Sequence, residues 1–261
     1  MEHPTDNPRR CVVELSDVSL EPAHRSGATS PPINWCVHEG DYWVVGGVHG
    51  AGKTQLISVM AGLEPPPRGK VALFGAPVDG LKEEELLRIR LKVGTVFDRG
   101  GRTFNHLTVF ENVALPLRYH RELSREQTRA EVDAILNATA LTPYTHVSPR
   151  NLNQSWQQRL ALARALALGP ELLLVDNPFL GLEFRHRQWW FDFLSEANQK
   201  GVFGQRRPLT LVITTDHLQP WMEHGQKFAA LKNRHWHILG TRADLSAERR
   251  NPAAEMSLEE I

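Results

Sequence analysis

One loop constrains the fold of this chain more than any other feature. Residues 47–54 have the sequence GVHGAGKT, which fits the pattern of a glycine, four residues, and then glycine-lysine-threonine. The apolar segment 42–45 before the loop predicts a strand, and residues 55–62 after it predict a helix. A strand, a glycine-rich turn and a helix N-terminus direct backbone N–H groups at one point, which suits a phosphate. A chance match is the alternative, and the flanking strand and helix argue against it.

The residues of the loop predict a nucleotide site. We expect Lys53 to reach the β- and γ-phosphates and the Thr54 hydroxyl to bind Mg²⁺. The side chain of His49 is expected to point either at phosphate or at solvent, and solvent is favoured because loop side chains usually point away from the bound anion. The predicted nucleotide-binding residues are Gly47, His49, Gly50, Ala51, Gly52, Lys53, Thr54 and Gln55.

Hydrophobic patterning predicts that strands and helices alternate along the chain. Strands are expected at 11–15, 33–37, 41–45, 70–74, 92–97, 171–175, 209–214, 228–231 and 235–239. Helices are expected at 55–62, 82–90, 109–117, 125–140, 154–168, 185–199 and 220–225. Continuous apolar runs such as 171–175 are typical of strands buried in a parallel sheet, so the pattern indicates an α/β fold. The aromatic run 189–191 is expected in the core or in a groove for a partner.

Composition excludes some classes of function. The 261 residues include 30 Lys and Arg and 30 Asp and Glu, so no basic excess points to nucleic acid. No apolar run approaches the roughly 20 residues needed to cross a bilayer, so a membrane role would need another chain. The N-terminus lacks the apolar segment of a signal peptide. Cys11 and Cys36 could form a disulfide, but free thiols of a cytoplasmic protein are the expectation.

The order and spacing of the motifs resemble the nucleotide-binding subunit of an ABC transporter over nearly the whole chain. Residues 152–166 resemble the signature helix, 172–178 the Walker B strand, 179–183 the D-loop, and 211–216 the strand that ends in the switch region. Residues 107–117 most resemble the branch that powers Mla/Mce-type lipid transport. The resemblance implies a P-loop NTPase fold of the ABC type, with a mostly parallel core sheet, an N-terminal antiparallel β subdomain and an inserted helical subdomain at about 98–165. It implies a single domain at 1–245 and a polar tail at 246–261.

The same resemblance implies a function. The chain is expected to bind Mg-ATP, with Asp176 and Thr54 holding Mg²⁺, and to drive or gate a membrane permease for lipid or organic solute transport. It implies a homodimer or heterodimer of ATP-binding subunits at the inner, cytoplasmic face of the membrane, with the permease docked between Asp98 and Pro149. Two alternatives remain: a catalytically inactive pseudoenzyme with a structural or regulatory role, and a soluble ABC-type protein acting on nucleic acid. The second alternative is disfavoured because there is no second cassette and no basic excess.

Several positions depart from the family pattern. Asn177 stands where the family has a catalytic glutamate, and an amide is a very poor proton acceptor. Thr215 replaces the switch histidine, and Asp98 replaces the Q-loop glutamine. These three positions form the predicted but degenerate catalytic set, and His217 is a disfavoured substitute for the lost histidine. The signature becomes Asn-Gln-Ser-Trp at 153–156, which loses both glycines and gains an indole. Hydrolysis is therefore expected to be slow or impaired.

Overall fold

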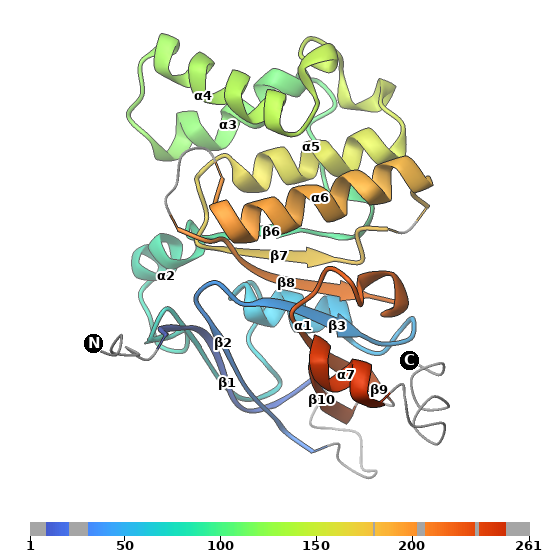
Figure 1. Ribbon diagram of the computed structural model, residues 1–261. Coiled ribbons are helices and arrows are strands. Elements are labelled where there is room, and N and C mark those ends of the chain that lie inside the picture. The colour runs from blue at the N-terminus through green and yellow to red at the C-terminus, as the bar shows by residue number, and fades with distance from the viewer. Residues whose placement is uncertain (1–8, 21–30, 180, 203–206, 233–234, 249–261) are drawn as a thin grey trace, which may run out of the picture.

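The computed structural model describes residues 9–20, 31–179, 181–202, 207–232 and 235–248. Two sheets and a group of helices are stacked in layers (Figure 1). The strands are β1 (Cys11–Ser19), β2 (Ile33–His38), β3 (Tyr42–Gly46), β4 (Arg68–Leu73), β5 (Ala76–Pro77), β6 (Val93–Val96), β7 (Leu172–Asp176), β8 (Thr210–Thr215), β9 (Lys227–Lys232) and β10 (His235–Thr241). The helices are α1 (Lys53–Met60), α2 (Glu83–Arg90), α3 (Val109–His120), α4 (Arg125–Ala138), α5 (Gln154–Leu166), α6 (Phe184–Lys200) and α7 (Arg242–Glu248).

A six-stranded sheet forms the centre of the molecule, in the order β10-β9-β3-β8-β7-β6. Its strands from β9 to β6 pair in parallel, and β10 pairs with β9 in antiparallel orientation. The prediction of an α/β fold with a mostly parallel core sheet is therefore confirmed. Because β8 lies between β3 and β7, the loops that follow these three strands meet at one edge of the sheet.

The second sheet is antiparallel and has four strands in the order β2-β1-β4-β5. It matches the antiparallel β subdomain expected near the N-terminus. Pairing of β1 with β2 brings Cys11 and Cys36 together, with their Cα atoms 6.1 Å apart and their Sγ atoms bonded at 2.12 Å. The expectation of free thiols was wrong, because the two cysteines become cross-strand neighbours despite a sequence separation of 25 residues.

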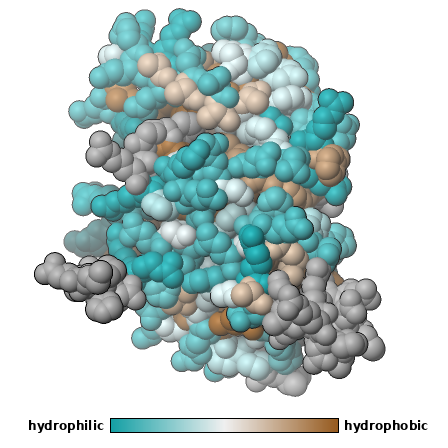
Figure 2. Space-filling view, viewed as in Figure 1, coloured by the Kyte–Doolittle hydropathy of each residue, from teal (hydrophilic) through white to brown (hydrophobic). Residues whose placement is uncertain are grey.

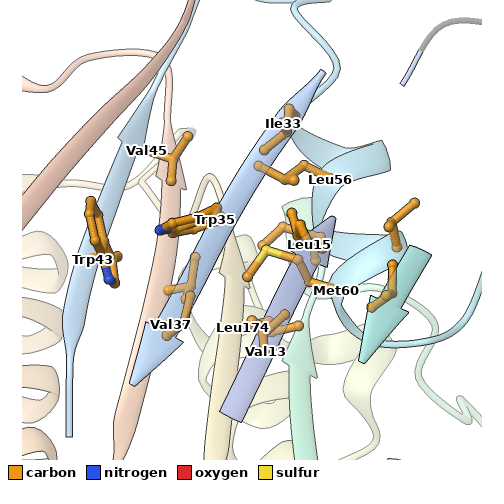
Figure 3. Close-up of a cluster of buried hydrophobic side chains, with 14 of the residues drawn as sticks. Val13, Leu15, Ile33, Trp35, Val37, Trp43, Val45, Leu56, Met60 and Leu174 are labelled. Atoms are coloured by element: carbon orange, nitrogen blue, oxygen red, sulfur yellow. The ribbon is translucent and has the colours of Figure 1, made fainter. Parts of the chain in front are cut away.

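A hydrophobic core fills the space between the two sheets and around α1. Figure 3 shows side chains of β1, β2 and β3 converging there on Leu56 and Met60 of α1 and on Leu174 of β7. The indoles of Trp35 and Trp43 meet edge to face, with centroids 5.2 Å apart. Alternate residues of the central strands point to this core, as expected for a pleated sheet buried on both faces. This packing fixes α1 against the sheet and so fixes the start of the helix at the end of the loop 47–54.

The other face of the central sheet is covered by α5 and α6 (Figure 1). Trp190 and Phe191 of α6 are buried in this second core, so part of the aromatic run 189–191 lies in the core as expected. Beyond these helices, α3 and α4 pack on a third cluster that includes Val113, Leu117 and Leu136. Capping boxes at Thr108 and Ser124 begin α3 and α4, since each hydroxyl accepts a hydrogen bond from the backbone three residues later.

A few elements differ from the sequence-based prediction. The predicted helix at 220–225 is a single 3₁₀ turn at Gln219–Trp221, and helix α7 was not predicted. The hairpin turn expected at 233–234 and most of the tail expected at 246–261 lie outside the described residues. No helix in the described ranges is long and apolar enough to cross a membrane. On the face seen in Figure 2 the surface is mostly hydrophilic, with only small hydrophobic areas.

Candidate functional site

The loop 47–54 joins the end of β3 to the start of α1. Gly50 and Gly52 have φ angles of 81° and 100°, a left-handed conformation that favours glycine. A Cβ on Gly47 would lie 2.6 Å from the carbonyl oxygen of Leu231, so only glycine fits at that position. Gly52 caps α1 without a side-chain hydrogen bond. The backbone N–H groups of the first turn of α1 can therefore serve an anion, as the sequence predicts.

Lys53 is the central cation of this site, and only 6% of its surface is exposed. Its ammonium donates to the carbonyl oxygens of Gly47 at 2.6 Å and Val48 at 2.9 Å. It also donates to the carboxylate of Asp216, at 2.8 Å from Oδ1. Sequence reasoning did not include Asp216 in the site, although its place directly after an apolar strand of the core sheet was a usable signal.

Thr54 and Asp176 meet at the same edge of the sheet. The Thr54 hydroxyl donates to Asp176 Oδ2 at 2.6 Å, and the Thr214 hydroxyl donates to Asp176 Oδ1 at 2.5 Å. Asp176 is 2% exposed, so its carboxylate is oriented by these two hydroxyls. A carboxylate beside a hydroxyl offers the hard oxygen ligands that Mg²⁺ prefers. These two residues therefore fit the metal role predicted for them, and they would hold Mg²⁺ together with oxygen ligands from outside the chain.

Asn177 follows Asp176 directly and adopts a φ angle of 43°, which asparagine tolerates better than most residues. Its backbone N–H donates to the carbonyl oxygen of Thr214 at 3.0 Å. Its side-chain amide donates to Asp216 Oδ2 at 2.8 Å. Partial burial opposes ionisation of Asp216, but the hydrogen bond and charge of Lys53, aided by Asn177, hold the pKa of this carboxyl below its usual value.

A cavity of about 240 Å³ collects most of these groups. Its lining residues are His49, Gly50, Gly52, Lys53, Thr54, Asp98, Asp176, Asn177 and Asp216. Of the predicted nucleotide-binding residues, Gly47, Ala51 and Gln55 are not part of this lining. Three carboxylates and one lysine line this cavity, so a triphosphate would need a divalent cation to reduce the repulsion.

Thr215 is placed differently from Asp98 and Asn177, the other two predicted catalytic positions. Its hydroxyl donates to the carbonyl oxygen of His217 at 3.0 Å and accepts from the backbone N–H of His217 at 3.2 Å. Thr215 is 4% exposed, and neither it nor His217 belongs to the lining of the cavity. The structure therefore brings Asp98 and Asn177 to the phosphate loop but closes Thr215 into a local turn.

The altered signature segment 153–156 begins α5. Asn153 caps the helix by accepting a hydrogen bond from the backbone N–H of Trp156 at 3.2 Å. The indole of Trp156 turns into an aromatic cluster, with its ring centroid 4.7 Å from that of Tyr144 and 5.2 Å from that of His186. The sequence predicted a bulky group in the motif but not this inward orientation.

Arg159 lies between two tryptophans of this cluster. Its guanidinium carbon is 4.6 Å from the ring centroid of Trp156 and 3.8 Å from that of Trp189. Burial lowers the pKa of Arg159 to about 10, and its Nη2 lies 3.2 Å from Nδ1 of His186. Burial and the nearby Arg159 charge also lower the pKa of His186. Arg159 of the signature helix is thus held by rings of its own chain.

Comparison with known proteins agrees with this geometry. The family model described as "ABC transporter" matches residues 31–180. The methionine import ATP-binding protein MetN of Carboxydothermus hydrogenoformans is 32% identical over 228 residues, covering 86% of this chain and 60% of that protein. The intermembrane phospholipid transport system ATP-binding protein MlaF of Haemophilus influenzae is 34% identical over 149 residues, covering 57% of this chain and 56% of that protein. The chain therefore spans less than two thirds of the length of these relatives.

Solved structures extend the likeness to the fold. The ATP-binding cassette MJ0796, solved as a dimer in a post-hydrolysis state with ADP and Pi, matches with a TM-score of 0.75 and 26% identity, covering 86% of this chain and 96% of that one. The cbiO1 protein of Clostridium perfringens, part of the ABC transporter complex cbiONQ, matches with a TM-score of 0.77 and 20% identity, covering 97% of this chain and 100% of that one. The phosphate loop, the strand order and these matches agree, and the chain belongs to the ABC transporter family.

Proposed function

We propose that this chain is the ATP-binding subunit of an ABC transporter, which binds Mg-ATP at the loop 47–54 and so drives or gates a membrane permease. The observation that carries the proposal is the buried Lys53 side chain. Lys53 is the first residue of α1, and its ammonium donates to the carbonyl oxygen of Gly47 in the loop. Thr54 and Asp176 would hold Mg²⁺ beside it, and the metal would neutralise charge on the phosphates. The names of the relatives support ATP binding and transport as the shared activity.

Hydrolysis at this site is proposed to be slow. Asn177 can hold a water molecule through its amide but is a poor proton acceptor, and loss of a positioned base costs about 10²–10⁴ in rate. The signature segment 153–156 lacks the glycines that the family uses to approach the γ-phosphate of a partner subunit. Because these glycines are missing, we expect weaker stabilisation of the transition state for hydrolysis as well. The alternative of a wholly inactive pseudoenzyme finds no support among the relatives.

The permease is proposed to dock on the helical subdomain, within residues 98–149. A groove of about 690 Å³ between α3, α4 and the following loop is lined by Arg118, Arg125 and Arg129 together with the apolar Phe110 and Leu123. Asp133 in the same groove lies 3.7 Å from Arg129. This composition fits a partner segment that carries both carboxylates and apolar side chains.

The remaining parts of the proposal rest on the family relationship. We propose a homodimer or heterodimer of ATP-binding subunits, because the cassette MJ0796 was solved as a dimer. The cytoplasmic, inner face of the membrane is the proposed location, as a peripheral subunit of the transporter. The similarity to MlaF supports a lipid or related organic solute as the transported substrate.

Mg-ATP turnover by the purified chain, alone and with its permease, tests this function. The Lys53→Ala variant gives the background rate, because it lacks the cation that binds phosphate. Turnover above that background, raised further by the permease, is the expected result. Turnover equal to the background in both preparations would contradict a driving role.

Docking needs a separate experiment. The double variant Arg118→Glu and Arg125→Glu is expected to lose co-purification with the permease while keeping its affinity for Mg-ATP, because the groove lies on another subdomain. The matched control is Arg185→Glu, which reverses one exposed charge on α6. Retention of the permease by the double variant would place the docking surface elsewhere.

A further inference from the structure

Thr214 is a buried hydroxyl residue that lies behind the carboxylate of Asp176. It pairs in register on β8 with Asp176 on β7, so the two side chains leave the sheet on the same face. Thr214 is 0% exposed, and among the described residues the cavity is lined by Asp176 and not by Thr214. The Thr214 hydroxyl donates to Asp176 Oδ1 at 2.5 Å. Thr214 therefore supports a wall of the cavity from the side of the protein interior.

The two oxygens of the Asp176 carboxylate have different hydroxyl partners. Oδ2 accepts from Thr54 at 2.6 Å, and Oδ1 accepts from Thr214. Thr54 is proposed to bind Mg²⁺, so its hydroxyl would have to turn from Oδ2 to the metal when the metal binds. The hydrogen bond from Thr214 needs no such change. It would keep Oδ1 occupied and so present Oδ2 as the oxygen that faces the metal.

The same hydroxyl also contacts the next residue of the cavity. Thr214 Oγ1 accepts from the backbone N–H of Asn177 at 3.2 Å, and the carbonyl oxygen of Thr214 accepts from the same N–H at 3.0 Å. Asn177 has a φ angle of 43° at the point where the chain leaves β7. Thr214 therefore holds the side chain of Asp176 and also the backbone that directly follows it.

We propose that Thr214 is a positioning residue of the metal site, which orients the carboxylate of Asp176 and so raises the affinity of the chain for Mg-ATP. This proposal rests on the proposed function, because it needs Mg²⁺ to bind at Thr54 and Asp176. Without the Thr214 hydroxyl, Oδ1 loses its donor and the carboxylate is free to rotate out of the orientation that suits the metal. Loss of such an outer partner of a metal ligand lowers metal affinity by about 10–100-fold.

Equilibrium titration of the full chain with ATP, in Mg²⁺ and in EDTA, tests the proposal. Thr214→Val removes the hydroxyl and keeps the shape of the side chain, so the affinity for ATP should fall by about tenfold in Mg²⁺ and stay within about twofold in EDTA. Thr214→Ser keeps the hydroxyl and should restore most of the affinity in Mg²⁺. Equal losses in Mg²⁺ and EDTA, no loss, or a Thr214→Ser variant as weak as Thr214→Val would overturn the proposal.

Thr210 provides the matched control at the other end of β8. It is also 0% exposed, and its hydroxyl accepts from the backbone N–H of Gly40 at 3.0 Å. Thr210→Val removes a buried hydroxyl just as Thr214→Val does, so it should lower the melting temperature but leave the ratio of the ATP affinities in Mg²⁺ and EDTA unchanged. An equal change of this ratio in both variants would contradict the proposal, because Thr214 would then act only on the fold.

A double variant shows whether Thr214 acts through Asp176. In an Asp176→Asn background the charge that would hold the metal is already lost, so Thr214→Val should add less than about twofold to the loss of affinity in Mg²⁺. A further tenfold loss would overturn the proposal. If Thr214→Val does not melt cooperatively, Thr214→Ala is compared with Thr210→Ala instead.

Failure of the proposed function is distinguishable from failure of this inference. If the unmutated chain binds ATP no better than Lys53→Ala, or no better in Mg²⁺ than in EDTA, the proposed function fails and this inference fails with it. If the unmutated chain responds to Mg²⁺ and Thr214→Val responds equally, only the role of Thr214 is overturned.

Discussion

Two faces of this molecule place their charged groups differently: one lines a cavity with them, and the other packs one between aromatic rings. The nucleotide face consists of the loop 47–54 with Asp176, Asn177 and Asp216, and its polar groups surround a cavity. The signature face consists of residues 153–156 with Tyr144, Arg159, His186 and Trp189. The indole of Trp156 packs against Tyr144 and His186, and Arg159 is buried between rings of the same chain.

This difference suggests that binding of a nucleotide by the chain itself and action on a nucleotide held by another subunit depend on different faces. Two side-chain hydrogen bonds on the nucleotide face, Lys53 to Asp216 and Thr54 to Asp176, can be exchanged for contacts with a ligand, because a phosphate can accept from Lys53 and a metal ion can bind Thr54 and Asp176. The aromatic contacts of the signature face stabilise the fold and offer little to a nucleotide held by another subunit. We therefore propose that the chain keeps the parts that bind a nucleotide, while Trp156 of the altered signature packs against rings of its own chain.

Among the variants considered, loss of the carboxylate proposed to bind the metal should reduce the affinity for Mg-ATP most. Asp176→Asn is expected to weaken binding of Mg-ATP by about 100-fold, because the amide removes the charge that would hold Mg²⁺ beside Thr54. Binding of ATP in EDTA should change far less. Isothermal titration with and without Mg²⁺ measures both effects, and Asp192→Asn is the control. A uniform loss in both conditions would mean that Asp176 acts in folding rather than through the metal.

A substitution on the signature face should lower the stability of the fold and leave the affinity for Mg-ATP nearly unchanged. Trp156→Gln removes one of the two rings that hold Arg159, so unfolding free energy should fall by about 2 kcal/mol. In a chain of this size the melting temperature should drop by about 4–8 °C. The affinity for Mg-ATP should stay within about twofold of the unmutated chain, which is a negligible free-energy difference.

A second aromatic residue provides the control for this variant. Tyr119 is 79% exposed, so Tyr119→Gln should leave the melting temperature nearly unchanged. Wild-type stability in Trp156→Gln would show that the ring cluster contributes nothing. A large loss of ATP affinity in that variant would show that the two faces are coupled within one chain.

The smallest expected effect is a pH dependence at the signature face. Burial and the charge of Arg159 lower the pKa of His186, so the folded state binds this proton more weakly than the unfolded state. The stability contributed by the neutral ring is complete above the unfolded value of about 6.5, and it is lost as pH falls from there toward the lower folded pKa. His186→Gln should reduce the loss of melting temperature between pH 7 and pH 5 by about 1 °C, because the ring is only partly buried.

Differential scanning calorimetry at the two pH values measures this difference. His224, whose pKa is also lowered by burial, contributes a separate share that should persist in His186→Gln and disappear in His224→Gln. An unchanged pH dependence in His186→Gln would show that neither burial nor the charge of Arg159 lowers the pKa of His186.

Local patterns predicted the nucleotide face well. The loop, the strand before it and the helix after it are contiguous, so their geometry follows from a short stretch of sequence. The apolar run before Asp176 likewise predicted a buried strand, and the parallel sheet confirms it. The contact between Lys53 and Asp216 was not predicted, because these residues are 163 positions apart and meet only through the strand order of the sheet.

The other features that the sequence did not predict depend on packing between elements that are distant in the chain. The sequence showed that Trp156 entered the signature but not that α5 and α6 would close two indoles around Arg159. The disulfide between Cys11 and Cys36 depends on the register of β1 against β2, which hydrophobic alternation alone does not set. The predicted role of Thr215 stays untested, although its hydroxyl is bonded within its own turn.

We propose above all that Lys53 organises a working nucleotide site in this chain. Isothermal titration of Mg-ATP into the purified chain and into Lys53→Ala tests it most directly, with exposed Lys200→Ala as the matched control. We predict saturable binding of one ATP per chain in the unmutated protein and in Lys200→Ala, and at least about 100-fold weaker binding in Lys53→Ala. Equal binding by all three proteins, or no binding by the unmutated chain, would contradict the account.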